Sequence, residues 1–284
     1  PSPQTKDEVF LRRVYLDLTG KIPTADEILA FKNGGRNKRP RKISELLNSD
    51  AYLDYWSDIW TSWLIGQERN NQRDIQEGLQ TWVRAQLTNN TPYDKFVLRL
   101  INATWDTRQN GASYYIRHYN ASPIDLTDHI SRLFLGLPMH CVQCHDHKTE
   151  AWYQEDYYNM AAFLTDVKSK EIYQNDVNGN RRIVGYDIVD EHEGSISIPG
   201  ESKQSQPILL DGTKYNGPQK KKREVLAKWI TDKKNPYFSQ AIVNRVWTQL
   251  MGKGFVEPLD GFGEENPPSH PKLLNWLAED FRIH

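Results

Sequence analysis

The chain contains two cysteines, and both lie in the five-residue stretch Cys141–Val142–Gln143–Cys144–His145. The pattern Cys-x-x-Cys-His is the attachment signature of c-type haem. In that chemistry the two thiols form thioethers with the haem vinyl groups, and the adjacent histidine binds the iron. We therefore predict that Cys141 and Cys144 attach one haem c and that His145 is the proximal iron ligand.

Three other interpretations of the cysteine pair stay open. A zinc site could use Cys141, Cys144 and His147, although the sequence offers no second ligand pair of comparable strength. A thioredoxin-like redox pair would follow a strand, whereas a helical pattern precedes this motif. A structural coincidence would leave the histidine directly after the pair unexplained.

The sixth iron ligand decides between electron transfer and substrate chemistry. We expect His147, two residues after the proximal ligand, to orient the motif, to contact a haem propionate, or to have a plain structural role. The candidate distal ligands are Met160, His270 and His118. An open sixth position is the remaining possibility.

The spacing of apolar residues predicts that the elements that position the cysteine motif are mainly helices. A helix is expected from Val9 to a stop at Gly20, and a capping box of Thr24 and Glu27 predicts a short helix through Phe31. Further helices are expected over 82–87, 93–100, 123–137, 154–164, 225–230, 239–251 and 271–281. The basic stretch 34–42 is expected to separate two apolar runs.

A helical spacing of aromatic residues, Tyr52, Trp56, Trp60 and Trp63, predicts a core-facing stripe rather than a sugar platform. The pattern changes after residue 166, where 182–190, 195–198 and 207–210 resemble short strands bounded by turn residues. We therefore predict a mainly α fold with a small β-rich insertion at about 167–213. The expected domains are 1–166 (helical, haem-bearing), 167–220 (insertion and linker) and 221–284 (helical).

Composition excludes several classes of protein. Lys and Arg number 36 and Asp and Glu 37 in 284 residues, a formal net charge of −1 that argues against nucleic-acid binding. No apolar run approaches the length of a membrane span, and two cysteines do not make a disulfide scaffold. The basic runs 36–42 and 220–223 are expected to be solvated loops or a docking surface for an acidic redox partner or a charged glycan.

Several longer segments of the chain resemble the planctomycete-associated cytochrome family, a domain of unknown function that is usually followed by a second uncharacterised domain. The segments that carry the resemblance are LRRVYLDLTG (11–20), IPT (22–24), FLGL (134–137), CVQCHDHK (141–148) and QEDYY (154–158). The partner domain is marked by NPYF (235–238), NRVW (244–247) and NPPSHP (266–271). The run Thr149–Trp152 departs from the aromatic residue and Asp-Pro that are usual in the family.

The resemblance implies an exported, periplasmic or extracellular haem protein, often found in polysaccharide-degradation settings, whose signal peptide is not part of this sequence. Its expected partners are a redox protein or a glycan, and the remainder of the partner domain in the parent protein. Electron transfer is the leading functional hypothesis. The alternatives are a haem-dependent oxidoreductase that acts on polysaccharide through an open iron site, and a binding or scaffold domain with structural haem or zinc.

Overall fold

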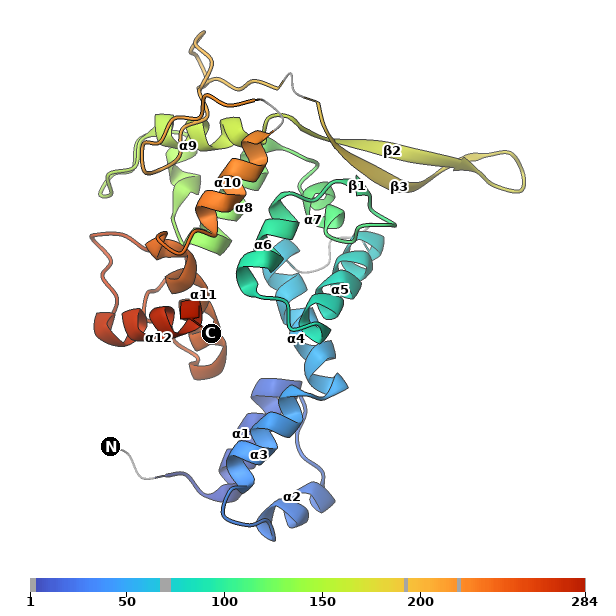
Figure 1. The fold of residues 1–284 in the computed structure, drawn as a ribbon, viewed down its shortest axis with the longest axis vertical. Coiled ribbons are helices and arrows are strands. Elements are labelled where there is room, and N and C mark those ends of the chain that lie inside the picture. The colour runs from blue at the N-terminus through green and yellow to red at the C-terminus, as the bar shows by residue number, and fades with distance from the viewer. Residues whose placement is uncertain (1–3, 67–72, 192–193, 219–220, 284) are drawn as a thin grey trace. The chain divides into compact units, whose positions relative to one another are not determined.

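The computed structural model describes residues 4–66, 73–191, 194–218 and 221–283. The fold is mainly α with a small antiparallel sheet, as predicted (Figure 1). The chain forms two compact units, one of residues 1–67 with 80–91 and the other of residues 68–79 with 92–284. The cysteine motif belongs to the second unit.

The first unit contains α1 (Asp7–Thr19), α2 (Ala25–Lys32), α3 (Lys38–Leu47), α4 (Asp50–Ile65) and the end of α5 (Arg73–Thr88). The predicted end of α1 is confirmed, because Gly20 adopts a left-handed φ of 65° and caps the helix. The capping box of Thr24 and Glu27 at the start of α2 is confirmed as well.

The basic run 36–42 was predicted to be a solvated loop or a docking surface, and the loop is wrong, since most of the run lies in α3. Lys38 and Arg39 both form ion pairs with Asp7 of α1, at 2.6 and 2.8 Å. Leu46, at the other end of α3, is buried with the core residues of α1 and α2. Tertiary contacts therefore stabilise a helix that a proline and a run of like charges do not favour locally.

The aromatic stripe on α4 is a core feature, as predicted. Trp56 and Trp60 are 6% and 9% exposed, and the indole Nε1 of Trp56 donates to the backbone oxygen of Asp17 at 3.2 Å. Trp63 packs edge-on against both rings. A buried indole N–H with a partner is the arrangement expected of a core tryptophan.

The second unit is built mainly from helices and short turns of helix (Figure 1). They are α6 (Tyr93–Ile101), α7 (Ser113–His118), α8 (Pro123–Ile130), the π-helical turn η1 (Ser131–Leu135), the 3-10 turn η2 (Met139–Gln143), α9 (Gln154–Ala161), the 3-10 turn η3 (Ala162–Leu164), α10 (Lys222–Ile230), α11 (Pro236–Met251) and α12 (Pro271–Ile283).

A three-stranded sheet in the order β1-β3-β2 is formed by β1 (Trp105–Asp106), β2 (Val167–Asn175) and β3 (Arg181–Asp190). The hairpin of β2 and β3 projects from its unit in Figure 1. Only β3 was predicted, because β2 is a half-exposed edge strand rich in polar residues. The expected strands 195–198 and 207–210 are wrong, since they contribute only isolated bridges, Ser197 to Gln204 and Ile208 to Lys214.

The basic run 220–223 was predicted to be solvated or to form a docking surface, but Lys222 and Arg223 are 6% and 5% exposed. Lys222 Nζ lies 3.2 Å from Asp166, and Arg223 Nη2 lies 2.7 Å from Asp190. Both basic residues are therefore internal ion-pair partners.

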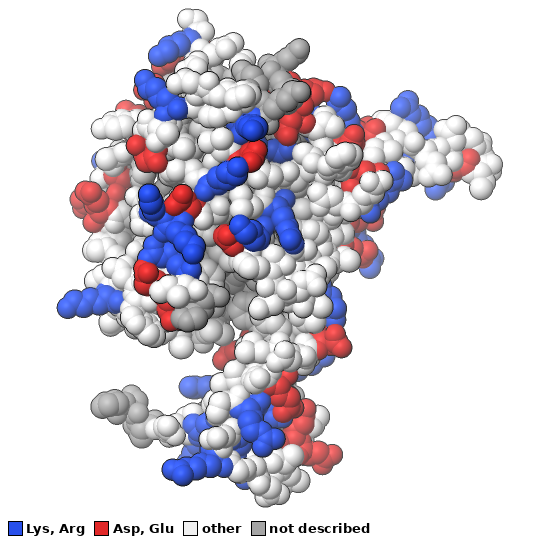
Figure 2. Space-filling view, viewed as in Figure 1, with Lys and Arg blue, Asp and Glu red and all other residues white. Residues whose placement is uncertain are grey.

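The face seen in Figure 2 shows acidic and basic side chains interspersed, in keeping with the balanced charge. Within the described ranges, no helix combines the length and apolar character needed to span a bilayer.

Candidate functional site

The cysteine motif occupies the last three residues of the short 3-10 turn η2 and the two residues after it. Residues three apart lie on the same side of a 3-10 helix. Met139 and Val142 both have 0% exposure and face the core, while Cys141 and Cys144 are exposed free thiols. The apolar pair thus anchors the turn and leaves both cysteines at the surface.

His145 is exposed, and its Nδ1 lies 2.7 Å from the backbone oxygen of Asp146. A carbonyl oxygen only accepts, so Nδ1 carries the proton and donates. The neutral ring then keeps an unprotonated Nε2. This is the tautomer of an imidazole that binds a metal through Nε2.

Gln154, the first residue of α9, connects the two ends of the motif. Its side-chain Nε2 donates to the backbone oxygen of Gln143 at 2.9 Å, and its backbone N–H donates to the carboxylate of Asp146 at 2.8 Å. The helix start therefore holds the residue before Cys144 and the residue after His145 at fixed positions.

His147 closes the loop that follows the motif. Its Nδ1 accepts from the backbone N–H of Glu150 at 3.1 Å and from that of Thr149 at 3.4 Å. The backbone N–H of His147 donates to the backbone oxygen of Trp152 at 2.8 Å. The run Thr149–Trp152, where the sequence departs from the family pattern, is thus organised around His147. These bonds give His147 a local structural role, and its Nε2–H stays a donor.

Glu150, in the same loop, contacts the connection between α11 and α12. Its carboxylate accepts hydrogen bonds from the backbone N–H groups of Glu264 and Glu265, at 2.8 and 3.1 Å. A Cβ atom at Gly263 would lie 2.2 Å from Oε1 of Glu150. A side chain at position 263 would therefore displace the carboxylate of Glu150 and disturb these two hydrogen bonds.

The three candidate distal ligands lie in three different settings. Met160 has 0% exposure on α9, a helix that packs against η2. His118 ends α7, with its ring edge-on to Tyr119 at a centroid distance of 4.8 Å. His270 is exposed, with Nδ1 3.3 Å from the hydroxyl of Ser269. The sixth ligand therefore stays a prediction.

The sequence analysis missed a buried polar pair between α7 and α8. Nδ1 of His129, which is 6% exposed, lies 2.9 Å from the hydroxyl of Tyr115. On the same helix, the carboxylate of Asp128 lies 3.3 Å from Nδ1 of His140, next to Cys141. Burial raises the pKa of Asp128, and the nearby histidine opposes this effect. From helical periodicity alone, a buried side chain that forms a hydrogen bond or ion pair cannot be distinguished from an ordinary core residue.

Within the part of the chain that the structure describes, no three His, Cys, Asp or Glu side chains form a group that could hold a metal ion. Cys141, Cys144 and His147 are therefore not arranged as a zinc site in this structure. Nδ1 of His147 accepts hydrogen bonds from backbone N–H groups. The motif follows the helical turns α8 and η1 rather than a strand, so the context of a thioredoxin-like pair is absent there too.

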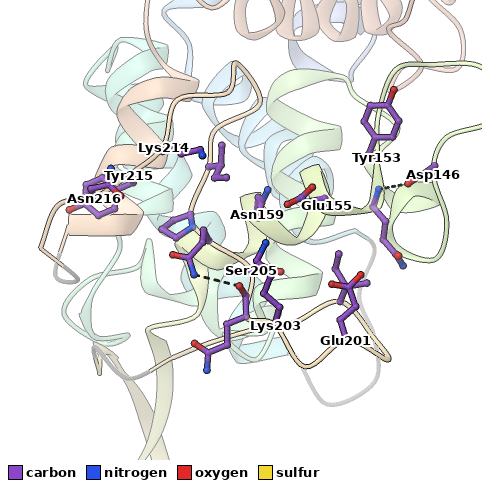
Figure 3. A pocket seen from close by; sticks show the side chains of 16 residues that line it. Asp146, Tyr153, Glu155, Asn159, Glu201, Lys203, Ser205, Lys214, Tyr215 and Asn216 are labelled. Carbon is purple, nitrogen blue, oxygen red and sulfur yellow. Dashed lines mark hydrogen bonds between the residues drawn. The ribbon is translucent and has the colours of Figure 1, made fainter.

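A polar cavity of about 650 Å³ begins at Asp146, directly after His145 (Figure 3). Its walls come from the start and one face of α9, from the segment 198–208 and from residues 214–216. Sequence reasoning did not find this cavity, because its walls come together only in the folded chain.

The fold and the motif define a mainly helical protein with a surface-exposed Cys-x-x-Cys-His turn. Residues 1–169 match the family PSCyt2, described as a protein of unknown function (DUF1549), and the chain belongs to that family. Residues 222–284 match PSD1, also described as a protein of unknown function (DUF1553). The expected pairing of the two domains is thus confirmed. Among curated proteins and solved structures, none matches the chain.

Proposed function

We propose that this chain is an exported c-type haem protein that transfers electrons to a redox partner. Cys141 and Cys144 would attach one haem, and His145 would be its proximal ligand. The observation that carries the proposal is the tautomer of His145, whose Nδ1 donates to the oxygen of Asp146 and leaves Nε2 for iron. A metal-binding histidine is commonly oriented by such a hydrogen bond.

The surroundings of the motif fit a covalently held haem. Both thiols are free and exposed on one side of a turn whose other side is anchored in the core. On α9, which packs against η2, Tyr157 and Tyr158 are 0% and 4% exposed, and burial raises the pKa of both phenols. They therefore present neutral aromatic rings at neutral pH. When bound, haem iron supplies one-electron redox chemistry.

The position of the motif favours electron transfer as the leading hypothesis. Cys141, Cys144 and His145 lie at the surface rather than inside the helical core. A partner protein can therefore approach the attachment site directly. The charges on the face in Figure 2 are mixed, so docking would depend on local complementarity rather than on net charge.

A second candidate is a haem-dependent oxidoreductase that acts on polysaccharide through an open iron site. One observation favours it, namely the polar cavity that starts at Asp146, next to the proposed proximal ligand. The periplasmic or extracellular location and the polysaccharide setting rest on the family resemblance alone.

The deciding test is made on protein that is produced together with a haem-attachment system. Its intact mass is measured after denaturation, and a pyridine haemochrome spectrum is recorded. A mass gain of one haem that is lost in Cys141→Ala/Cys144→Ala supports the proposal. His147→Gln is the matched control and should keep the haem. Absence of the mass gain, with one bound zinc instead, would contradict it.

Spectra of the loaded protein separate the two candidates. Electron transfer predicts a low-spin, six-coordinate haem that does not readily bind CO or cyanide. A stable high-spin spectrum with rapid binding of these ligands, and oxidised products from a glycan with peroxide or oxygen, would favour the enzyme.

A further inference from the structure

The cavity beside the motif has a buried floor and an exposed rim. Asn159 on α9 forms part of the floor and is 6% exposed. Among the described residues, the side-chain amide of Asn159 makes no hydrogen bond to the protein. The atoms of this amide are accessible from the cavity, and they bond to water until a ligand replaces it.

The position of Asn159 on α9 places its amide at the cavity wall. Glu155 lies one turn earlier on α9, so both side chains lie on the face that lines the cavity. In Figure 3 the two lie among the other lining side chains. The amide therefore offers a donor and an acceptor to whatever occupies the space.

The rim carries charges of both signs. Lys203 and Lys214 lie on the two segments, 198–208 and 214–216, that line the cavity together with α9. Glu201 is two residues before Lys203 (Figure 3). Within the described ranges, none of these three residues nor Glu155 forms a side-chain ion pair. Their donors and acceptors remain available, and a lining with two lysines and two carboxylates does not favour a strongly charged ligand of either sign.

Two tyrosines complete the lining. Tyr153 is 57% exposed, and Tyr215 is held by a hydrogen bond from its hydroxyl to the oxygen of Pro218 at 2.6 Å. Aromatic rings offer flat apolar faces beside the polar groups. A cavity of about 650 Å³ is within the ordinary size range of small-ligand sites.

We propose that this cavity binds a neutral, polyhydroxylated ligand, a short oligosaccharide. Hydroxyl groups both donate and accept, so they satisfy the amide of Asn159, the ammonium groups and the carboxylates at once. The apolar faces of sugar rings fit against tyrosine. The proposal rests on the cavity and not on haem attachment, although it would supply the substrate site of the second candidate function.

The test uses the full chain produced with the haem-attachment system, whether or not haem attaches, and titration calorimetry with three neutral probes, cellotriose, xylotriose and mannotriose. The charged probes are trigalacturonate and a glucosamine trimer. We expect saturable binding of at least one neutral trisaccharide, and no stronger binding of either charged one. Asn159→Leu, which keeps the volume but removes the amide, should weaken this binding at least tenfold.

Two further variants keep the test decisive if Asn159→Leu does not fold. Lys214→Met and Glu155→Gln should each weaken binding about threefold to tenfold, by the loss of one hydrogen-bonding group. The matched control Lys272→Met, an exposed lysine at the start of α12, should bind as the parent protein does.

Three results would overturn the proposal: no binding of any neutral probe at 10 mM, preferential binding of a charged probe, or binding that none of the cavity variants changes. The two proposals fail separately. Sugar binding without haem attachment contradicts the redox proposal alone, and haem attachment without sugar binding contradicts the cavity proposal alone.

Discussion

The carboxylate of Glu150 lies so close to Gly263 that a Cβ atom there would approach Oε1 to 2.2 Å. The same carboxylate accepts hydrogen bonds from the next two backbone N–H groups, of Glu264 and Glu265. Glu150 follows the cysteine motif, while Gly263 lies in the part of the chain that matches the PSD1 family. This contact therefore ties the motif loop to the partner segment.

Gly263→Ala should lower the free energy of unfolding by about 1–3 kcal/mol, because the new methyl group displaces the carboxylate. Urea denaturation measures the change. Gly35→Ala is the matched control, since nothing lies within 4 Å of that position, and it should change stability by at most about 0.5 kcal/mol. Equal stability of the two variants would contradict the close contact.

The buried guanidinium of Arg223 should be essential for folding stability. It donates to the oxygens of Ile101 and Ala103, at 3.1 and 2.7 Å, and pairs with Asp190. Arg223→Met leaves these acceptors without their donor and should cost about 3 kcal/mol or more in the free energy of unfolding. The exposed Lys228→Met is the control, and a similar small effect for both would show that Arg223 is solvated.

Both thiols of the haem-free protein should react with Ellman's reagent without denaturant, because Cys141 and Cys144 are exposed and free. The expected stoichiometry in the reduced protein is two thiols per chain. Loading with haem should abolish the reaction, because thioether formation consumes both thiols. One or no reactive thiol in the haem-free protein would contradict the surface position of the turn.

Asp128 should make stability fall as pH rises through its titration. Burial raises its pKa in the folded protein above the unfolded value. Between the two pKa values the native state therefore binds more protons, and the free energy of unfolding decreases with pH. Above the folded pKa, Asp128 is a partly buried charge whose desolvation opposes folding.

Asp128→Asn removes this titration. Relative to the parent protein, the variant should therefore gain stability as pH increases from about 4 to 7, measured by urea denaturation at each pH. Asp125→Asn changes the same charge at an exposed position of α8 and is the control. A stability difference that does not change with pH would contradict the prediction.

Much of the helical architecture could be predicted because the signals are local. Thr24 and Glu27 satisfy the backbone of the turn that they begin, and Gly20 ends α1 because it adopts a left-handed conformation readily. The errors came where distant residues decide the outcome. The helix α3 depends on Asp7 of α1, and β2 is an edge strand that depends on pairing with β3.

For the site, the sequence by itself determined which groups are present: two thiols at the spacing of a haem attachment motif, followed by a histidine. Tertiary structure decided their setting. The hydrogen bond from His145 to Asp146 is local, whereas the connection made by Gln154 and the place of Asn159 in the cavity wall depend on chain segments that meet only on folding.

The basic run 220–223 shows the difference most directly. Its charge is evident from the sequence, but the sequence does not show that Asp166 and Asp190 lie opposite Lys222 and Arg223. A charged side chain becomes buried only where the fold supplies a partner that compensates its desolvation. Residue type and spacing are local properties, whereas burial and pairing are properties of the whole packed chain.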